Sequence, residues 1–254
     1  MTKLDGKRIL VTGAAGGLGQ AIAACLIDCS ARVVLSDRDA AALEAVRRGL
    51  PDGSTEIIVA DLLSDAGIAA LAEQAGAAGL DGLVNCAGMY PVTPLEQLSA
   101  AEWDHVLGLN LRAPFLLSQA LIPALEPRRG AIVNISSTAS TLARPGIAHY
   151  GASKAALNQL TRLMAVELAA KGIRVNAVLP GVIGTPRVLA GDGSPENVAE
   201  MKAKVARIPQ RRLGEPKEVA PLVAYLLSDE ASYVTGALMT VDGGFSLGIA
   251  SYGE

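Results

Sequence analysis

Short apolar runs alternate with helical stretches along almost the whole chain. The apolar runs, rich in Val, Ile and Leu, fall at 8–12, 32–36, 56–60, 81–85, 130–135, 172–179 and 238–241. Between them, apolar residues recur at helical spacing over 21–29, 64–78, 99–124, 149–171 and 215–228. Pro114 predicts a break within the third of these helices. This alternation predicts the α/β class, with a single doubly wound parallel sheet flanked by helices on both faces.

No linker, internal repeat or low-complexity segment divides the chain, so residues 1–254 are interpreted as one domain. The pattern loosens only at about 186–214, where glycines and prolines surround a short amphipathic helix at 196–207. An insertion of this length beside a site is commonly a substrate loop or lid. Its basic residues are Lys202, Lys204, Arg207, Arg211 and Arg212. They would suit an acidic substrate, but the interspersed glutamates favour a solvated surface.

Composition excludes several classes of function. Hydrophobic residues make up 50% and charged residues 19%, so the chain can bury a large core. A net charge of −3 gives no electrostatic reason to expect a nucleic-acid partner. No uninterrupted apolar run approaches ~18–20 residues, and the N-terminal residues lack a signal-peptide core, so we expect a cytoplasmic protein without a membrane span. Cys25, Cys29 and Cys86 form no disulfide framework or metal set, and we expect no metal site.

A glycine-rich turn, Gly13 to Gly19, joins the first predicted strand to the first helix. Glycines allow the tight turn and a close approach of the backbone, while a helix N-terminus offers free N–H groups to a pyrophosphate. Strand, glycine turn and helix in this order predict a dinucleotide site. A plain β–α connection without a ligand is the alternative.

Asp37 ends the second predicted strand, a little over ~20 residues beyond the first glycine. A carboxylate there accepts hydrogen bonds from an adenosine ribose and repels a 2′-phosphate, which favours NAD over NADP. Arg38 tempers this preference, because an arginine can contact a 2′-phosphate. Position 16 is Gly rather than a basic residue, so the glycine turn offers no second basic contact to a 2′-phosphate. NAD is therefore the expected cofactor.

Tyr150 and Lys154 are four residues apart on a predicted helix, so their side chains should share a face. A phenol with a pKa near ~10 stays protonated at neutral pH and so cannot act as a base. A nearby ammonium group lowers that pKa by favouring the phenolate. Ser137, at the end of the preceding strand, would hold a substrate oxygen beside that phenol. The three residues indicate acid–base chemistry at a carbonyl or an alcohol, although a solvated helix face produces the Tyr/Lys spacing easily.

Together these motifs resemble the short-chain dehydrogenase/reductase family from Thr12 to Gly244. The resemblance rests on an ordered set: Thr12-Gly13-x-x-x-Gly17-x-Gly19, Asp61, Asn85-x-Ala87-Gly88, Asn110, Ser137, Tyr150-x-x-x-Lys154 and Asn176-x-x-x-Pro180-Gly181. It implies a Rossmann-type fold and a catalytic tetrad of Asn110, Ser137, Tyr150 and Lys154. In that tetrad Tyr150 is the acid or base, Lys154 lowers its pKa, and Asn110 orders a proton-relay water.

The resemblance also implies which residues contact the cofactor. These are Gly13, Gly17, Leu18, Gly19, Asp37, Asp61, Leu62, Asn85, Ala87, Gly88, Tyr150, Lys154, Pro180, Gly181, Ile183 and Thr185. The chain departs from the family pattern at Cys86, where a second Asn is common, and at Ser140, where Gly is common. Neither departure removes a catalytic group.

The leading hypothesis is an NAD(H)-dependent oxidoreductase that interconverts a small secondary alcohol and a ketone. The first alternative is a 3-oxoacyl-[acyl-carrier-protein] reductase, for which Arg128, Arg129 and Lys171 would be basic docking residues. A catalytically silent nucleotide-binding scaffold is less favoured, because the tyrosine, lysine and serine are all present. An extended sugar-nucleotide epimerase would need a longer C-terminal region. Family resemblance also implies a homotetramer, or a dimer, that packs the 99–124 and 149–171 helices between subunits.

Overall fold

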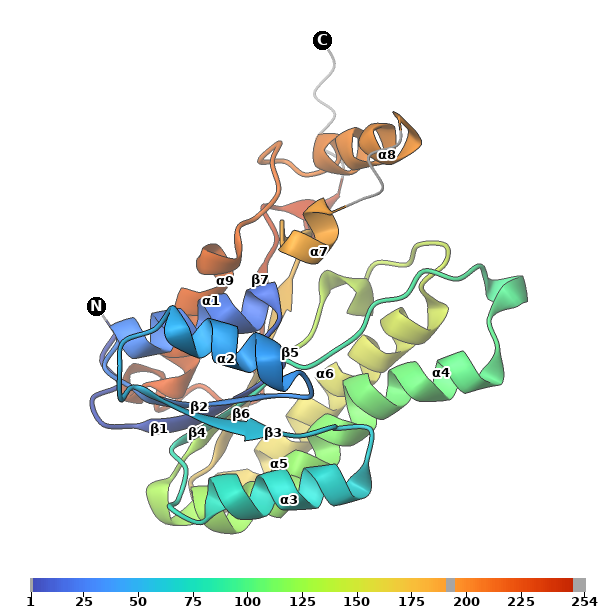
Figure 1. The fold of residues 1–254 in the computed structure, drawn as a ribbon. Coiled ribbons are helices and arrows are strands. Elements are labelled where there is room, and N and C mark those ends of the chain that lie inside the picture. Colours follow the sequence, from blue (N-terminus) through green and yellow to red (C-terminus); the bar gives the residue numbers. More distant parts are fainter. Residues whose placement is uncertain (1, 191–194, 249–254) are drawn as a thin grey trace.

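The computed structural model describes residues 2–190 and 195–248, and these form a seven-stranded, fully parallel sheet with helices on both faces (Figure 1). The strands are β1 (Arg8–Thr12), β2 (Arg32–Asp37), β3 (Thr55–Val59), β4 (Gly82–Asn85), β5 (Ala131–Ile135), β6 (Arg174–Pro180) and β7 (Leu238–Val241). Their order is β3-β2-β1-β4-β5-β6-β7, so the direction of winding reverses between β1 and β4. Ligands of such sheets bind at the carboxyl ends of the strands beside this reversal. The predicted doubly wound fold is confirmed.

Each face of the sheet carries its own helical layer. On one face lie α1 (Gly17–Asp28), α2 (Ala40–Arg48) and α9 (Pro216–Leu227), and on the other lie α3 (Asp65–Gly76), α5 (Ala113–Leu125) and α6 (Ala148–Leu168). Side chains alternate along β1 between the two layers, with Ile9 and Val11 packed toward α1 and Leu10 toward α3. All three are fully buried, which explains why the strands read as apolar throughout.

The helical segment predicted at 99–124 is continuous, but a π-helical turn interrupts its α-helical hydrogen bonding before Pro114. It consists of α4 (Ala100–Leu107), a π-helical turn at Gly108–Arg112, and α5, in whose first turn Pro114 lies. Proline is tolerated there because the first N–H groups of a helix have no partner within it. Single π turns within helices often occur at functional sites. This turn carries Asn110.

By length and composition alone, the helical run Ala100–Arg128 would be long and apolar enough to cross a membrane. Its apolar character has a local cause in this fold, because Leu117, Leu121 and Leu125 are fully buried against the sheet. Core helices pass the same test of length and composition, so the run carries no argument for a membrane span.

Two short helices, α2 and the first helix of the lid segment, were not predicted from the sequence, whereas the helix predicted at 196–207 is present. Asp39 caps α2 by accepting a hydrogen bond from the N–H of Ala42 at 2.9 Å. The segment predicted as a lid contains α7 (Pro186–Leu189) and α8 (Pro195–Ala206), which stand beyond the carboxyl ends of the strands (Figure 1, orange). Residues 191–194 of that segment lie outside the described part of the chain.

Candidate active site

The glycine turn after β1 is fixed by close backbone contacts. Gly13 has φ +65°, and a Cβ there would lie 2.7 Å from Cα of Ala87. A Cβ on Gly19 would lie 2.2 Å from the carbonyl oxygen of Gly13. Thr12 joins the turn to the segment after β4, because its hydroxyl oxygen accepts hydrogen bonds from the N–H groups of Cys86 (3.1 Å) and Ala87 (3.2 Å). A side chain at Gly13 would therefore force the two segments apart, and one at Gly19 would clash with the turn itself.

The N-terminus of α1 meets the requirements of a pyrophosphate site. Gly16 precedes the helix, no side chain caps it, and its first turn carries no acidic residue. Its N–H groups and the positive end of its dipole are thus available to an anion. Asp37 lies beside this turn, where one carboxylate oxygen accepts a hydrogen bond from the N–H of Ala15 at 3.3 Å. The turn, the helix and the carboxylate fit the phosphates and ribose of a dinucleotide.

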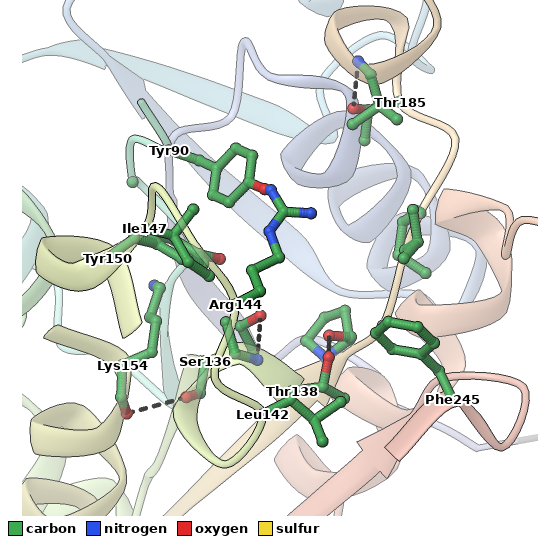
Figure 2. A pocket seen from close by; sticks show the side chains of 18 of the residues that line it. Tyr90, Ser136, Thr138, Leu142, Arg144, Ile147, Tyr150, Lys154, Thr185 and Phe245 are labelled. Carbon is green, nitrogen blue, oxygen red and sulfur yellow. Dashed lines mark hydrogen bonds between the residues drawn. The ribbon is translucent and has the colours of Figure 1, made fainter. Parts of the chain in front are cut away.

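A cavity of about 600 Å³ opens at the carboxyl ends of β4, β5 and β6 and extends under the lid segment (Figure 2). The predicted site residues that line it are Leu18, Gly88, Ser137, Tyr150, Lys154, Pro180, Gly181, Ile183 and Thr185. Those outside its wall are Gly13, Gly17, Gly19, Asp37, Asp61, Leu62, Asn85, Ala87 and Asn110. Among these, Asp37 ends β2 and Asp61 follows β3, where an adenosine would extend away from the cavity. Asp61 is exposed, whereas Leu62 is buried.

Asn85 belongs to a buried polar network rather than to the cavity wall. Its amide nitrogen donates to the side-chain oxygen of Asn134 at 2.8 Å and to the hydroxyl of Ser118 at 3.1 Å. Asn134 in turn donates to the hydroxyl of Thr161 at 2.9 Å. Buried amides are costly unless they are hydrogen-bonded, and this chain of bonds ties β4 and β5 to the helices behind them. The side chain of Asn85 thus supports the site from behind.

Asn110 is fully buried and holds the segment after β4 through both atoms of its amide. Its oxygen accepts from the N–H of Met89 at 2.9 Å, and its nitrogen donates to the carbonyl of Met89 at 3.0 Å and to the Ser153 hydroxyl at 3.1 Å. A Cβ on Gly88 would lie 3.2 Å from its oxygen and 3.7 Å from Nζ of Lys154. Asn110 is therefore close to the lysine without lining the cavity.

Tyr150 and Ser137 lie together in the wall of the cavity. Burial raises the pKa of the Tyr150 phenol above its ordinary value of 10.0, while a hydrogen bond from Ser137 and the positive charge of Arg144 act to lower it. Ser137 is also aligned by the N–H of Ala139, which donates to its oxygen at 3.1 Å. The neighbouring Ser136 instead donates to the backbone carbonyl of Lys154 at 3.3 Å. The geometry thus supports Ser137, rather than Ser136, as the partner of the tyrosine.

Lys154 is buried, with its ammonium group donating to the carbonyl of Ile135 at 2.8 Å. Nζ lies 5.9 Å from the centroid of the Tyr150 ring. Burial lowers the pKa of Lys154 to about 8. In this structure the groups that lower the tyrosine pKa are Ser137 and Arg144, so the expected effect of Lys154 on that pKa is not seen. The ammonium lies over the ring and donates its hydrogen bond to a strand carbonyl.

Sequence reasoning missed an aromatic and cationic group on the substrate side of the cavity. Tyr90 contacts Tyr150 edge to face, with ring centroids 4.7 Å apart at 81°. The guanidinium carbon of Arg144 lies 5.3 Å from the centroid of Tyr90. Both residues belong to irregular segments, so no periodicity marked them, and Tyr90 lies 60 positions from Tyr150 in the chain.

The basic residues of the lid segment do not act as one solvated surface. Lys204 and Arg207 line the cavity, and Arg207 stacks over Phe245 at 5.6 Å. The other two arginines point elsewhere: Arg211 donates to the carbonyl of Ala206 and Arg212 pairs with Glu218 at 2.7 Å. Arg207 is nevertheless exposed and Lys204 only half-buried, so both side chains still meet solvent at the cavity.

His149 lies outside the cavity wall, as expected from its place beside Tyr150 on a helix. It is fully buried, and its Nε2 lies 3.2 Å from a carboxylate oxygen of Glu102, which also accepts from the Thr93 hydroxyl at 2.7 Å. The N–H of Thr93 donates to the carbonyl of Gly146 at 2.8 Å. These bonds fasten the Tyr90 segment to the start of α6.

Cys86 is not activated as a nucleophile. Burial raises the pKa of its thiol to about 12, which keeps the thiol protonated and unreactive at neutral pH. Among the described residues, no cluster of His, Cys, Asp or Glu is arranged to hold a metal ion.

Comparison with known proteins places this site in a family. The family model described as "Enoyl-(Acyl carrier protein) reductase" matches residues 13–246. Galactitol 2-dehydrogenase (L-tagatose-forming) of Cereibacter sphaeroides is 39% identical over 249 residues, covering 96% of this chain and 97% of that protein. The chain belongs to the short-chain dehydrogenase/reductase family. A 3-oxoacyl-[acyl-carrier-protein] reductase of this family, from Thermotoga maritima, is 37% identical over 95% of this chain and 98% of that protein.

Solved structures of the family share the fold closely. That of a putative NAD(P) dependent gluconate 5-dehydrogenase from Beutenbergia cavernae, with bound NADP, superposes with a TM-score of 0.89 at 38% identity. The match covers 96% of this chain and 98% of that one. The chain is therefore an oxidoreductase of the short-chain dehydrogenase/reductase family, whose members use NAD or NADP.

Proposed function

We propose that the protein is an NAD(H)-dependent oxidoreductase that interconverts a small secondary alcohol and the corresponding ketone. One observation carries this proposal: Tyr150, bonded to Ser137, faces a cavity that adjoins the glycine turn. A nicotinamide bound there would supply a hydride to the carbonyl carbon or accept one from the alcohol carbon. The residues of the chain must then bind the substrate oxygen and move one proton to or from it.

Each residue has a distinct task in that proton transfer. Tyr150 gives its phenolic proton to the oxygen during ketone reduction and accepts one during alcohol oxidation. Ser137 would hold the substrate oxygen within reach of the phenol. Because burial raises the pKa of Tyr150, the phenol keeps its proton at neutral pH and is ready to act as an acid. Asn110 holds the Met89 backbone close to Lys154 and is the proposed anchor of a water that returns protons from solvent.

Reduction of acyl-carrier-protein substrates is the second candidate function, supported by the Thermotoga maritima relative. It requires a basic surface that docks the acidic carrier protein. Here Arg128 lies 3.6 Å from Asp81, and Lys171 pairs with Glu126 at 2.8 Å. These ion pairs neutralise part of the expected docking surface, so the small-molecule function is favoured.

NAD is the proposed cofactor because of Asp37. Its carboxylate stands at the end of β2 beside the glycine turn, where it would accept hydrogen bonds from a ribose diol and repel a 2′-phosphate. The Beutenbergia cavernae structure contains NADP, so membership of the family does not by itself select NAD.

Substitution of Asp37 with Ala should shift the ratio of kcat/KM for NADPH over NADH upward by about 10- to 100-fold, the equivalent of losing one or two charged hydrogen bonds. Arg38 is retained in this variant and would meet the 2′-phosphate. Steady-state assays with both cofactors measure the ratio. Asp39→Ala is the matched control, because this neighbouring carboxylate only caps α2. An unchanged ratio in Asp37→Ala would place cofactor selection elsewhere.

We also propose a homotetramer in the cytoplasm. Phe115 on α5 and Leu163 and Val166 on α6 are exposed apolar side chains, with Val166 80% exposed. Exposed apolar residues gathered on neighbouring helices are typical of subunit interfaces. The three cysteines are free thiols, which suits a reducing compartment.

Sedimentation of the purified protein should give the mass of a tetramer, and Val166→Glu should reduce it to dimers or monomers. A buried carboxylate without a partner is costly at an apolar interface. Val59→Glu provides the control, because Val59 is half exposed on β3, far from α6 in the sheet order. A wild-type monomer would refute this assembly.

The proposed function is tested by a panel of small ketones and secondary alcohols, assayed with NADH or NAD and with NADPH or NADP at the nicotinamide absorbance band. We expect turnover of several members of the panel, with NADH preferred. Cofactor binding without turnover of any of them would favour the scaffold hypothesis instead.

A further inference from the structure

The substrate side of the cavity has an unusual charge balance. Arg144, Lys154, Lys204 and Arg207 line the cavity, and none of the described residues that line it is Asp or Glu. The chain as a whole carries a net charge of −3, so this positive wall is a local feature. A concave site lined by one sign of charge concentrates ligands of the opposite sign.

Arg144 is the cation whose charge acts on the Tyr150 phenol. It comes from the segment between Ser137 and α6, and Figure 2 shows its side chain extending along the cavity beside Tyr90 and Tyr150. The guanidinium carbon of Arg144 lies 5.3 Å from the ring centroid of Tyr90, and that centroid lies 4.7 Å from the ring centroid of Tyr150. The guanidinium carbon is therefore within about 10 Å of the Tyr150 ring centroid. A small molecule can therefore contact both groups at once. The lowering of the Tyr150 pKa by Arg144 is consistent with this proximity.

The contact with Tyr90 holds the Arg144 guanidinium at the cavity. The positive charge of an arginine is attracted to the face of an aromatic ring, and its planar guanidinium carries N–H donors in a fixed fork. That arrangement suits a planar carboxylate, which binds a guanidinium through two parallel hydrogen bonds. The elements expected to hold the adenosine and the pyrophosphate, by contrast, lie at the ends of β1, β2 and β3, so Arg144 is placed for the substrate.

A second arginine–aromatic pair lies on the lid side of the same cavity. Arg207, just after α8, stacks over Phe245, and Lys204 lies one turn earlier on that helix. In Figure 2, Phe245 is drawn across the cavity from Tyr90 and Arg144. These lid cations would add to the attraction of an anion as it enters.

We propose that the substrate is a small oxo acid or hydroxy acid whose carboxylate is bound by Arg144 on Tyr90, with the reacting carbon held at Ser137 and Tyr150. This inference rests on the proposed alcohol–ketone chemistry and names its substrate class. The carboxylate serves only to bind and orient the substrate and takes no part in the bond changes. The reaction adds one hydride from the cofactor and one proton from Tyr150 to the carbonyl group, and the reverse reaction removes them.

The test compares acids with their uncharged counterparts. 3-Oxobutanoate, 4-oxopentanoate and 5-oxohexanoate are each assayed beside their methyl esters, in the wild type and in Arg144→Met. We expect at least one acid to be preferred over its ester in the wild type. In Arg144→Met the acid-to-ester ratio of kcat/KM should fall about 10- to 100-fold, mainly through KM, since a charge-assisted hydrogen bond is lost. Arg212→Met is the matched control, because Arg212 pairs with Glu218 outside the cavity and should leave the ratio unchanged.

A binding experiment keeps the two proposals separable. Pentanoate and pentanamide, which have neither a ketone to reduce nor a secondary alcohol to oxidise, are titrated calorimetrically into the protein saturated with NAD. Pentanoate should bind at least 10-fold more tightly than pentanamide, and Arg144→Met should abolish the difference. Equal binding of the two compounds, or an acid-to-ester ratio that Arg144→Met leaves unchanged, would overturn the carboxylate proposal. If pentanoate binds through Arg144 but no ketone is reduced, the alcohol–ketone function fails while the anion site stands.

Discussion

Replacement of Tyr150 with Phe should lower kcat for ketone reduction by about 10³-fold or more, while cofactor affinity stays near the wild-type value. The substitution removes only the hydroxyl that gives up the proton. The ring can keep its edge-to-face contact with Tyr90 at 4.7 Å, so the cavity wall should hold its shape. Ser137 cannot take over the role, because a serine hydroxyl is too weak an acid at neutral pH.

The measurement has two parts for this variant. Absorbance at the nicotinamide band gives kcat, and quenching of protein fluorescence by NADH gives the Kd of the cofactor. Tyr233→Phe serves as the matched control, because Tyr233 is fully exposed on the surface and should leave both values unchanged. Retention of more than a tenth of the wild-type kcat in Tyr150→Phe would rule out the tyrosine as the acid.

Sequence alone predicted the parts of the site that follow from regular structure. Tyr150 and Lys154 share a helix face because they are four residues apart, and Ser137 follows a strand whose end faces the same region. The sheet order places the glycine turn after β1 next to the segment after β4, on either side of the reversal in winding. The helical period and the positions of residues at strand ends were sufficient to predict these features.

Features that depend on irregular backbone were not predictable in the same way. Asn110 reaches Met89 from a π-helical turn, and nothing in a helical period indicates where such a turn falls. Tyr90 and Arg144 come from loops and meet only in the folded chain. The lid arginines show the same limit, since Arg207 faces the cavity and Arg212 pairs with Glu218, although only five positions separate them.

The pKa values of Tyr150 and Lys154 also could not be predicted from the spacing of the residues. The Tyr/Lys spacing predicted that the ammonium of Lys154 would lower the pKa of the phenol. The structure shows instead that burial dominates at both groups, raising the pKa of Tyr150 and lowering that of Lys154 to about 8. Burial depends on everything packed around the pair, so the cost of holding a charge there becomes visible only in three dimensions.

Lys154→Met should therefore stabilise the cofactor-free protein at pH 7 while abolishing turnover. The shift from the ordinary 10.5 to about 8 in the pKa of Lys154 means that the buried charge costs about 3 kcal/mol. Loss of the hydrogen bond to the carbonyl of Ile135 offsets about 1 kcal/mol of the gain. The net gain of about 2 kcal/mol corresponds to a rise in Tm of about 4–8 °C for a chain of this length.

The pH dependence of that gain identifies its cause. Between pH 8 and pH 10.5 the unfolded chain holds the Lys154 proton more tightly than the folded protein, so wild-type stability rises with pH through this window. The advantage of Lys154→Met should accordingly be full below about pH 8 and shrink as the pH approaches 10.5. Thermal unfolding from pH 6 to pH 10.5, with Lys217→Met as an exposed-lysine control, measures it. A variant that is less stable than the wild type at every pH would show that Lys154 supports the fold, and that its burial carries no net cost.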